Sequence, residues 1–178
     1  MGQNSTFKKV NLFTGIIFSN EMKIEPVLSL LEKMFSERDL VSDIIDFNFT
    51  DYYFDEMGKP LKRLFISFSK LISPELLPEI KLITNEVEDK YSVSGKRKIN
   101  LDPGYLSDAN VIIATTKNYY QRIPLRSGIY AHMEYVIKGK DLNMLEWTYP
   151  DFRSENYLSF FRKMLILYKK KMNFKKVT

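Results

Sequence analysis

The sequence predicts an α+β fold, an antiparallel sheet built on a ferredoxin-like β-α-β-β-α-β unit with extra C-terminal strands and a final amphipathic helix. Two patterns predict it. Apolar and polar residues alternate over residues 45–49 and 129–137, which is the period of a strand with one face in water. Over residues 27–35 and 157–168 the apolar residues recur every three or four positions, as in a helix that buries one side.

The first half of the chain supplies the unit in order. Strand, helix, strand, strand, helix and strand are expected at residues 10–19, 26–37, 45–49, 64–68, 73–90 and 98–101. Pro26 suits the first position of the first helix, and Ser73-Pro74-Glu75 is a strong start for the second, with a capping hydroxyl, a proline and an acid. A turn at residues 55–59 joins the two middle strands into a wide hairpin.

The second half predicts further strands and the last helix. The Asp-Pro-Gly-Tyr run at residues 102–105 is expected to be a turn, because Asp can cap it, Pro presets φ and Gly accepts positive φ. Later strands and the helix are expected at residues 111–116, 129–137 and 142–147 and from Ser154 onwards.

Composition limits the possible classes of protein. A chain of 178 residues buries enough surface for one core, and no repeat or linker divides it, so residues 1–178 are expected to form a single domain. With no Cys, disulfide scaffolds, Cys-ligated zinc, iron–sulfur clusters and cysteine nucleophiles are excluded. The single histidine, His132, shares a predicted strand face with Tyr130 and Glu134. A surface or structural role is expected for it ahead of a catalytic one.

Positive charge is concentrated at the C-terminus. The formal net charge is +5, but residues 1–161 hold all 22 acidic residues and all but seven of the 27 basic ones, a net charge of −2. Residues 169–178 are expected to form a basic tail that could be flexible. Such an end can attract nucleic acid or acidic lipid, although lysines also gather at helix C-termini because the helix dipole favours cations there.

Several function classes lack their signals. No apolar run approaches the roughly 18 residues that cross a bilayer, and the first residues lack the apolar stretch and cleavage site of a signal peptide. A cytoplasmic location is therefore expected. The G-x-x-x-x-G-K-[ST] and G-x-G-x-x-G loops are also absent, which argues against P-loop and Rossmann nucleotide enzymes.

Three cations follow the strand at residues 111–116. Lys117 stands at its exit, and Arg122 and Arg126 come soon after. They could bind a phosphate or carboxylate, arginine through a bidentate fork and lysine as a point charge. The alternative is a solvated edge that discourages strand pairing.

Acids and rings supply the remaining candidates. Residues 51–56 hold three acids and three aromatic rings, and residues 147–151 place Trp147 and Asp151 before the last helix. Glu56, Asp102 and Asp151 are the candidate ligands of a divalent metal, and Asp102 and Lys117 are the candidate catalytic residues. Tyr105, Tyr130 and Trp147 could stack on a base or sugar, although such rings are more often the fringe of a core.

Together these motifs resemble an uncharacterised bacterial family classed as a domain of unknown function. The matching segments are YYFDEMG at residues 52–58, NLDPGY at 100–105, ATTK at 114–117, GIYA at 128–131 and WTYPD at 147–151. The resemblance implies a small cytosolic protein with no established activity. Some members are labelled GTP-binding, but this chain has neither a P-loop nor an N-K-x-D guanine motif. In the family pattern a histidine often occupies the position of Gln121.

Three hypotheses follow. The first is a binding module for a nucleotide, a sugar phosphate or an RNA phosphate, in which the cations at 117, 122 and 126 hold the anion and the rings at 105, 130 or 147 stack. The second is a phosphoryl or ester hydrolase assisted by Mg²⁺ or Mn²⁺. The third is an interaction protein that docks through its basic C-terminal helix.

Overall fold

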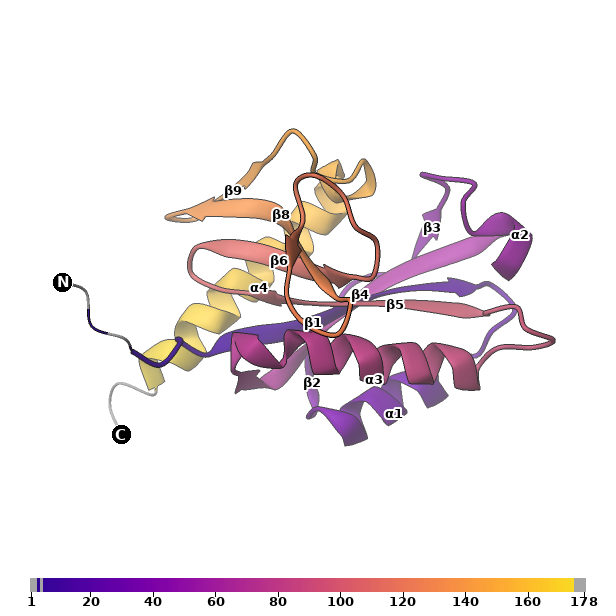
Figure 1. Cartoon of the computed structure of the whole chain (residues 1–178), viewed down its shortest axis with the longest axis horizontal. Coiled ribbons are helices and arrows are strands. Elements are labelled where there is room, and N and C mark those ends of the chain that lie inside the picture. The colour runs from indigo at the N-terminus through magenta and orange to yellow at the C-terminus, as the bar shows by residue number, and fades with distance from the viewer. Residues whose placement is uncertain (1–2, 4, 175–178) are drawn as a thin grey trace.

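The computed structural model describes residue 3 and residues 5–174, and in this part of the chain one nine-stranded sheet carries helices on both faces (Figure 1). The strand order is β2-β4-β1-β5-β6-β8-β7, with β3 paired to β4 and β9 paired to β8, and every pairing is antiparallel. The strands are β1 (Val10–Ser19), β2 (Arg38–Val41), β3 (Ile45–Phe47), β4 (Leu61–Ile72), β5 (Ile99–Leu106), β6 (Asn110–Thr115), β7 (Ile123–Pro124), β8 (Tyr130–Lys138) and β9 (Asp141–Met144). The helices are α1 (Glu25–Met34), α2 (Phe54–Met57), α3 (Leu77–Lys90) and α4 (Glu155–Phe174), with 3₁₀ turns η1 (Pro74–Leu76) and η2 (Asp151–Arg153).

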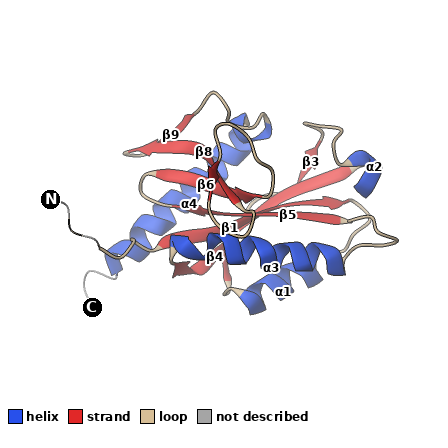
Figure 2. Cartoon of the chain, in the orientation of Figure 1, coloured by secondary structure: helices blue, strands red, loops and turns tan. Residues whose placement is uncertain are grey.

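The two faces of the sheet carry separate cores. Because side chains of a strand point alternately to opposite faces, Leu12 and Ile16 of β1 pack in one cluster with α1 and α3, and Phe13 packs in another with α4. Figure 2 shows α1 and α3 below the sheet. The predicted α+β fold with a large antiparallel sheet and a final helix is confirmed.

The first half of the chain follows the predicted order of elements, with one strand added. Residues 38–41 form β2, where no strand was expected, and the expected strand at 45–49 is reduced to the three residues of β3. Both pair with β4, so the predicted hairpin between β3 and β4 is present. The expected turn at 55–59 contains the short helix α2 instead.

The predicted turn at residues 102–105 is wrong, because β5 runs straight through it. β6 pairs only with Gly104, Tyr105 and Leu106, so the earlier part of β5 has strand β1 on one side and no strand on the other. Residues two apart in a strand direct their backbone groups to the same side. The backbone nitrogen of Pro103 therefore faces the open edge, as that of Leu101 does. Because no strand pairs there, the lack of an N–H on Pro103 costs the sheet no hydrogen bond.

The glycine of this run is needed for space. Gly104 lies opposite Phe13 and Ile113, and a Cβ atom there would lie 2.4 Å from the carbonyl oxygen of Ile112 and 2.5 Å from the Phe13 ring. The residue permits close contact between the sheet and the α4 core.

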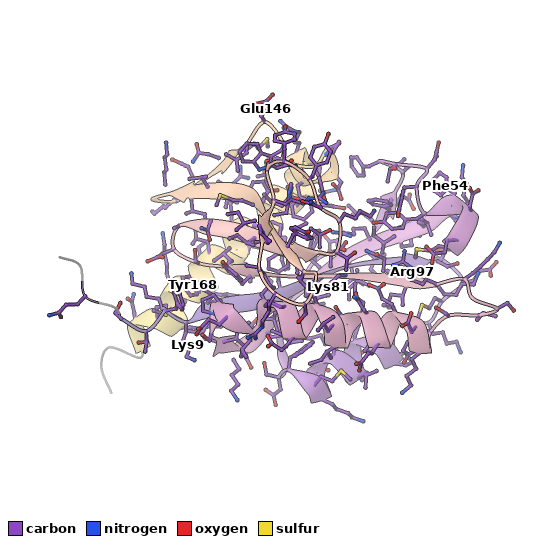
Figure 3. The ribbon with its side chains drawn as sticks, in the orientation of Figure 1. Lys9, Phe54, Lys81, Arg97, Glu146 and Tyr168 are labelled. Carbon is purple, nitrogen blue, oxygen red and sulfur yellow. The ribbon has the colours of Figure 1, made fainter. Side chains whose placement is uncertain are left out.

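Helix α4 buries one side against the sheet. Tyr157, Phe161 and Met164 belong to its core cluster, and the hydroxyl of Tyr168 donates to the carbonyl of Lys9 (Figure 3). The predicted tail starts inside this helix, since residues 169–174 continue it, and residues 175–178 lie outside the described chain. No helix in the described part is both long and apolar enough to span a bilayer.

A substitution at Gly104 tests its place in the sheet. Gly104→Ala is expected to lower the free energy of unfolding by about 1–3 kcal/mol, because β6 or Phe13 must move to admit the methyl group. Urea denaturation followed by fluorescence measures this. An unchanged midpoint would contradict the close strand packing.

Candidate functional site

A cavity of about 820 Å³ opens where β5 and β6 diverge. It is lined from one side by Asn100 and Asp102 of β5 and from the other by residues 113–117 at the end of β6. The segment before α2, helix α3 and the start of η2 complete the wall. Its volume lies in the range of small-molecule sites, which is roughly 300–1,000 Å³.

An ion pair between a buried arginine and a partly buried aspartate crosses the sheet at the floor of this cavity. Arg63 of β4 is 1% exposed, and its Nη1 donates to Oδ2 of Asp102 on β5 at 3.1 Å. Strand β1 lies between these strands, and its Gly15 stands directly opposite Asp102. A Cβ at Gly15 would lie 2.5 Å from Nη2 of Arg63. The absent side chain thus lets the guanidinium pass over β1.

Aromatic rings hold the guanidinium of Arg63 in place. Its centre lies 4.6 Å from the ring centroid of Phe65, and the rings of Phe47, Phe152 and Tyr157 lie within 6.0 Å. Contacts of this kind stabilise a desolvated guanidinium through the negative faces of the rings. Arg63 is therefore a fixed charge that cannot move out towards a ligand.

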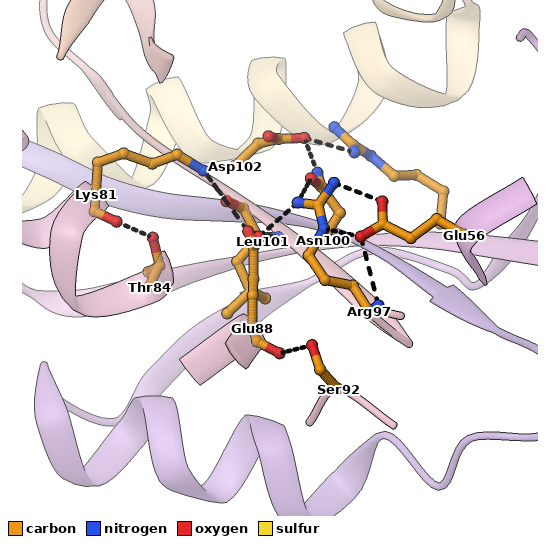
Figure 4. Close-up of polar contacts among 10 residues, drawn as sticks. Glu56, Lys81, Thr84, Glu88, Ser92, Arg97, Asn100, Leu101 and Asp102 are labelled. Atoms are coloured by element: carbon orange, nitrogen blue, oxygen red, sulfur yellow. Dashed lines mark hydrogen bonds and ion pairs between the residues drawn. The ribbon is translucent and has the colours of Figure 1, made fainter. Parts of the chain in front are cut away.

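A second polar network joins α2, α3 and β5 (Figure 4). Arg97 donates through two nitrogens to both carboxylate oxygens of Glu56, at 2.6 and 2.8 Å, and to Glu88 at 2.7 Å. Glu88 also accepts from the N–H of Leu101, whose carbonyl accepts from Lys81, both at 2.7 Å. Two side chains of α3 thereby take the hydrogen bonds that β6 leaves unmade on the open edge of β5.

Lys117 lies at the rim of the cavity with its ammonium group exposed. The Nζ atom lies 3.8 Å from the ring centroid of Tyr52, and Lys117 forms no ion pair with any residue in the described part of the chain. Arg122 holds the segment in place, because it donates to the carbonyl of Lys117 at 2.7 Å and to the hydroxyl of Tyr149 at 2.6 Å. Its guanidinium thus fixes the loop, whereas the sequence predicted a ligand-binding group.

Asp151 lies deeper in the cavity, at the start of η2, and is 8% exposed. Burial raises the pKa of its carboxyl group, and the nearby charge of Arg63 opposes this shift. Asp102 in turn is held by Arg63 and by Asn100, whose Nδ2 donates to it at 2.9 Å. The two aspartates therefore share a cavity but differ in their partners.

The structure brings together only part of the predicted site. Lys117, Asp102 and Asp151 line the cavity. Five predicted ligand-binding residues do not line it: Tyr105, Arg122, Arg126, Tyr130 and Trp147. Arg126 pairs with Glu79 and donates to the Glu75 carbonyl, and Trp147 donates to the Met133 carbonyl.

The predicted metal ligands are not assembled into a metal site. Glu56 is bound to Arg97, and Asp102 is bound to Arg63. Among the residues that the structure describes, no three His, Asp or Glu side chains converge on a point where they could hold a metal ion.

Sequence reasoning missed most of the aromatic wall. Phe49, Tyr52, Tyr53 and Tyr149 line the cavity. The dense run of rings and acids at residues 51–56 was the available signal for Tyr52 and Tyr53. Tyr149 lies within the run at 147–151, but nothing in that run distinguishes it as a residue of the cavity wall.

A buried pair lies behind the aromatic wall. His132 and Glu134 of β8 are fully buried, whereas the alternating pattern had suggested a half-exposed face, and Nε2 of His132 lies 3.3 Å from Oε1 of Glu134. The ring of Tyr149 stacks on the ring of His132, with 4.7 Å between the centroids. The backbone N–H of Tyr149 donates to Oε2 of Glu134 at 3.0 Å. Burial raises the pKa of Glu134.

These features define an α+β domain with one ligand-sized polar cavity at an opening in its sheet. The chain belongs to the family described as Domain of unknown function (DUF4416), whose model matches residues 8–168. No curated protein and no solved structure matches the chain.

The buried ion pair can be tested by a double-mutant cycle. Arg63→Met is expected to lower the free energy of unfolding by about 1–3 kcal/mol, because the partly buried Asp102 loses its charged partner. Adding Asp102→Asn should recover part of that loss. Lys62→Met, which breaks the exposed pair with Asp46, is the control and should cost less than about 1 kcal/mol. A double variant no more stable than Arg63→Met would contradict the pairing.

The buried carboxyl group of Glu134 makes stability depend on pH. Because its pKa is raised in the folded state, the wild type loses stability as pH rises from the ordinary glutamate value through the raised one. Glu134→Gln removes this loss, so its stability relative to wild type should grow between pH 4.5 and 8. Urea unfolding at several pH values measures the difference. The exposed Glu146→Gln controls for net charge, and a difference independent of pH would contradict the burial of a titrating group.

Proposed function

We propose that this protein binds a small phosphorylated organic ligand, a nucleotide or a sugar phosphate, in the cavity between β5 and β6. The observation that carries the proposal is the position of Lys117. It is a cation without an ion pair in the described chain, at the rim of a cavity whose wall is aromatic.

The charges of the cavity leave Lys117 as the free cation for an anion. Arg63 pairs with Asp102, Lys81 lies 3.6 Å from Glu88, and Arg97 pairs with Glu56 and Glu88. A lysine ammonium group binds phosphate as a point charge. The phosphate of the ligand is therefore expected at the rim.

The rings favour a ligand with a flat or apolar body. Phe49, Tyr52 and Tyr53 offer surfaces on which a base or a sugar can stack. The cavity volume of about 820 Å³ is in the range of sites that hold one small molecule, which favours a single nucleotide or sugar phosphate.

The rival hypotheses receive less support. A metal-assisted hydrolase lacks a cluster of three potential metal ligands among the described residues. A docking helix would need a free apolar face, but that face of α4 is packed on the sheet, and Lys171 bonds to Asn11 and pairs with Asp39. A cytoplasmic location remains part of the proposal.

Removing the rim cation tests the proposed function. In a thermal-shift screen of nucleotides and sugar phosphates, the compound that stabilises the wild type should bind Lys117→Ala at least tenfold more weakly. The unliganded melting temperature should change little, because Lys117 is exposed. Lys140→Ala, an exposed lysine on the turn between β8 and β9, is the matched control. Equal stabilisation of the wild type and Lys117→Ala would contradict the proposal.

A further inference from the structure

Asp151 is a buried carboxyl group in the wall of the cavity. It is 8% exposed and forms no ion pair in the described part of the chain. The charge of Arg63 and the backbone N–H groups of Asp151 and Phe152 stabilise its charged form, but burial outweighs them, because they replace only part of the water that the carboxylate loses. Burial accordingly raises the pKa of this group.

The neighbouring aspartate shows what a satisfied carboxylate at this site looks like. Asp102 accepts hydrogen bonds from Arg63 at 3.1 Å and from Asn100 at 2.9 Å, both on Oδ2. Arg63 is clamped by rings and cannot swing away to serve Asp151 alone. A carboxylate has about four acceptor sites, so Asp151 can still accept from donors of a ligand beyond the backbone N–H groups beside it.

The cations around the floor are already engaged. Arg63, Lys81 and Arg97 all line the cavity, and each is buried or half-buried. Arg63 pairs with Asp102, Lys81 lies 3.6 Å from Glu88, and Arg97 pairs with Glu56 and Glu88. None of the three forms an ion pair with Asp151.

We propose that Asp151 is a specificity residue which binds hydrogen-bond donors at the end of the ligand that enters the cavity first, while Lys117 holds the phosphate at the rim. The inference rests on the proposed function. It gives the ligand an orientation, with its hydrogen-bond donors inside the cavity and its phosphate at the rim. Inorganic phosphate alone, which lacks the organic part, would not be the natural ligand.

Two chemical groups supply such donors. A sugar presents a vicinal diol, and a carboxylate that accepts from ribose hydroxyls is a recurrent mode of nucleotide recognition. A nucleobase presents amino and imino groups. Both satisfy the same carboxylate acceptor, so the probes must separate them.

Calorimetric titration of the full chain with five probes tests the proposal. The probes are ribose 5-phosphate, 2-deoxyribose 5-phosphate, adenosine 5′-monophosphate, its 2′-deoxy form and inorganic phosphate. At least one of the organic phosphates should bind at least tenfold more tightly than inorganic phosphate. Loss of affinity on removing the 2-hydroxyl identifies the diol as the donor, and affinity only for the two adenosine compounds identifies the base.

Asp151→Asn supplies the residue-specific arm. It should weaken the donor-bearing probe at least tenfold and leave inorganic phosphate within twofold, because the amide keeps one acceptor and loses the charge. Asp141→Asn, an exposed aspartate on β9, is the matched control. The wild-type comparison of the five probes needs no variant, so it can still overturn the inference if Asp151→Asn does not fold.

The outcomes separate the two proposals. Binding that depends on Lys117 but is unchanged in Asp151→Asn overturns the inference about Asp151 and leaves the proposed function standing. Inorganic phosphate that binds as tightly as the organic probes overturns the inference as well. Absence of binding by all five probes overturns both.

Discussion

The ion pair between Arg63 and Asp102 is the constraint around which this molecule is arranged. It joins strands β4 and β5 across the intervening strand, and it forms only because Gly15 has no side chain to block the guanidinium. The same guanidinium lies against rings of the α4 core, so the floor of the cavity and the packing of the last helix depend on one residue. Loss of either partner would leave the other charge uncompensated in a poorly solvated place, so the two residues depend on each other.

The opening in the sheet follows from a second constraint, the free edge of β5. An unpaired strand edge normally attracts another strand. Here Lys81 and Glu88 of α3 cover the backbone of Leu101, and Pro103 has no N–H to satisfy. The backbone groups of Leu101 therefore keep hydrogen-bond partners where the sheet divides, and β6 diverges and forms the other wall of the cavity. The site exists because helix side chains replace a strand.

Much of the fold could be predicted because its signals are local. The apolar run of β1 and the helical spacing of α4 reflect burial on fixed periods, and both elements lie where the sequence placed them. Strand β2 is only four residues long and half-buried, so no alternation marks it. Asp-Pro-Gly has turn chemistry, but the long-range pairing of β5 with β1 overrides it.

Of the candidate site, Lys117, Asp102 and Asp151 were predictable as polar residues next to strand ends. The engagement of Arg122 with Tyr149 was not, because it depends on a contact between residues 27 positions apart.

The cavity thus combines a floor of paired acidic and basic side chains, an aromatic wall and one exposed cation. In the proposed function, each of these features contributes to binding a phosphorylated ligand. The most direct measurement is a crystal structure of the protein with ribose 5-phosphate bound. The account predicts the phosphate within contact of the Lys117 ammonium group and the sugar hydroxyls against Asp151. A ligand bound in the reverse orientation, or at a surface outside the cavity, would contradict it.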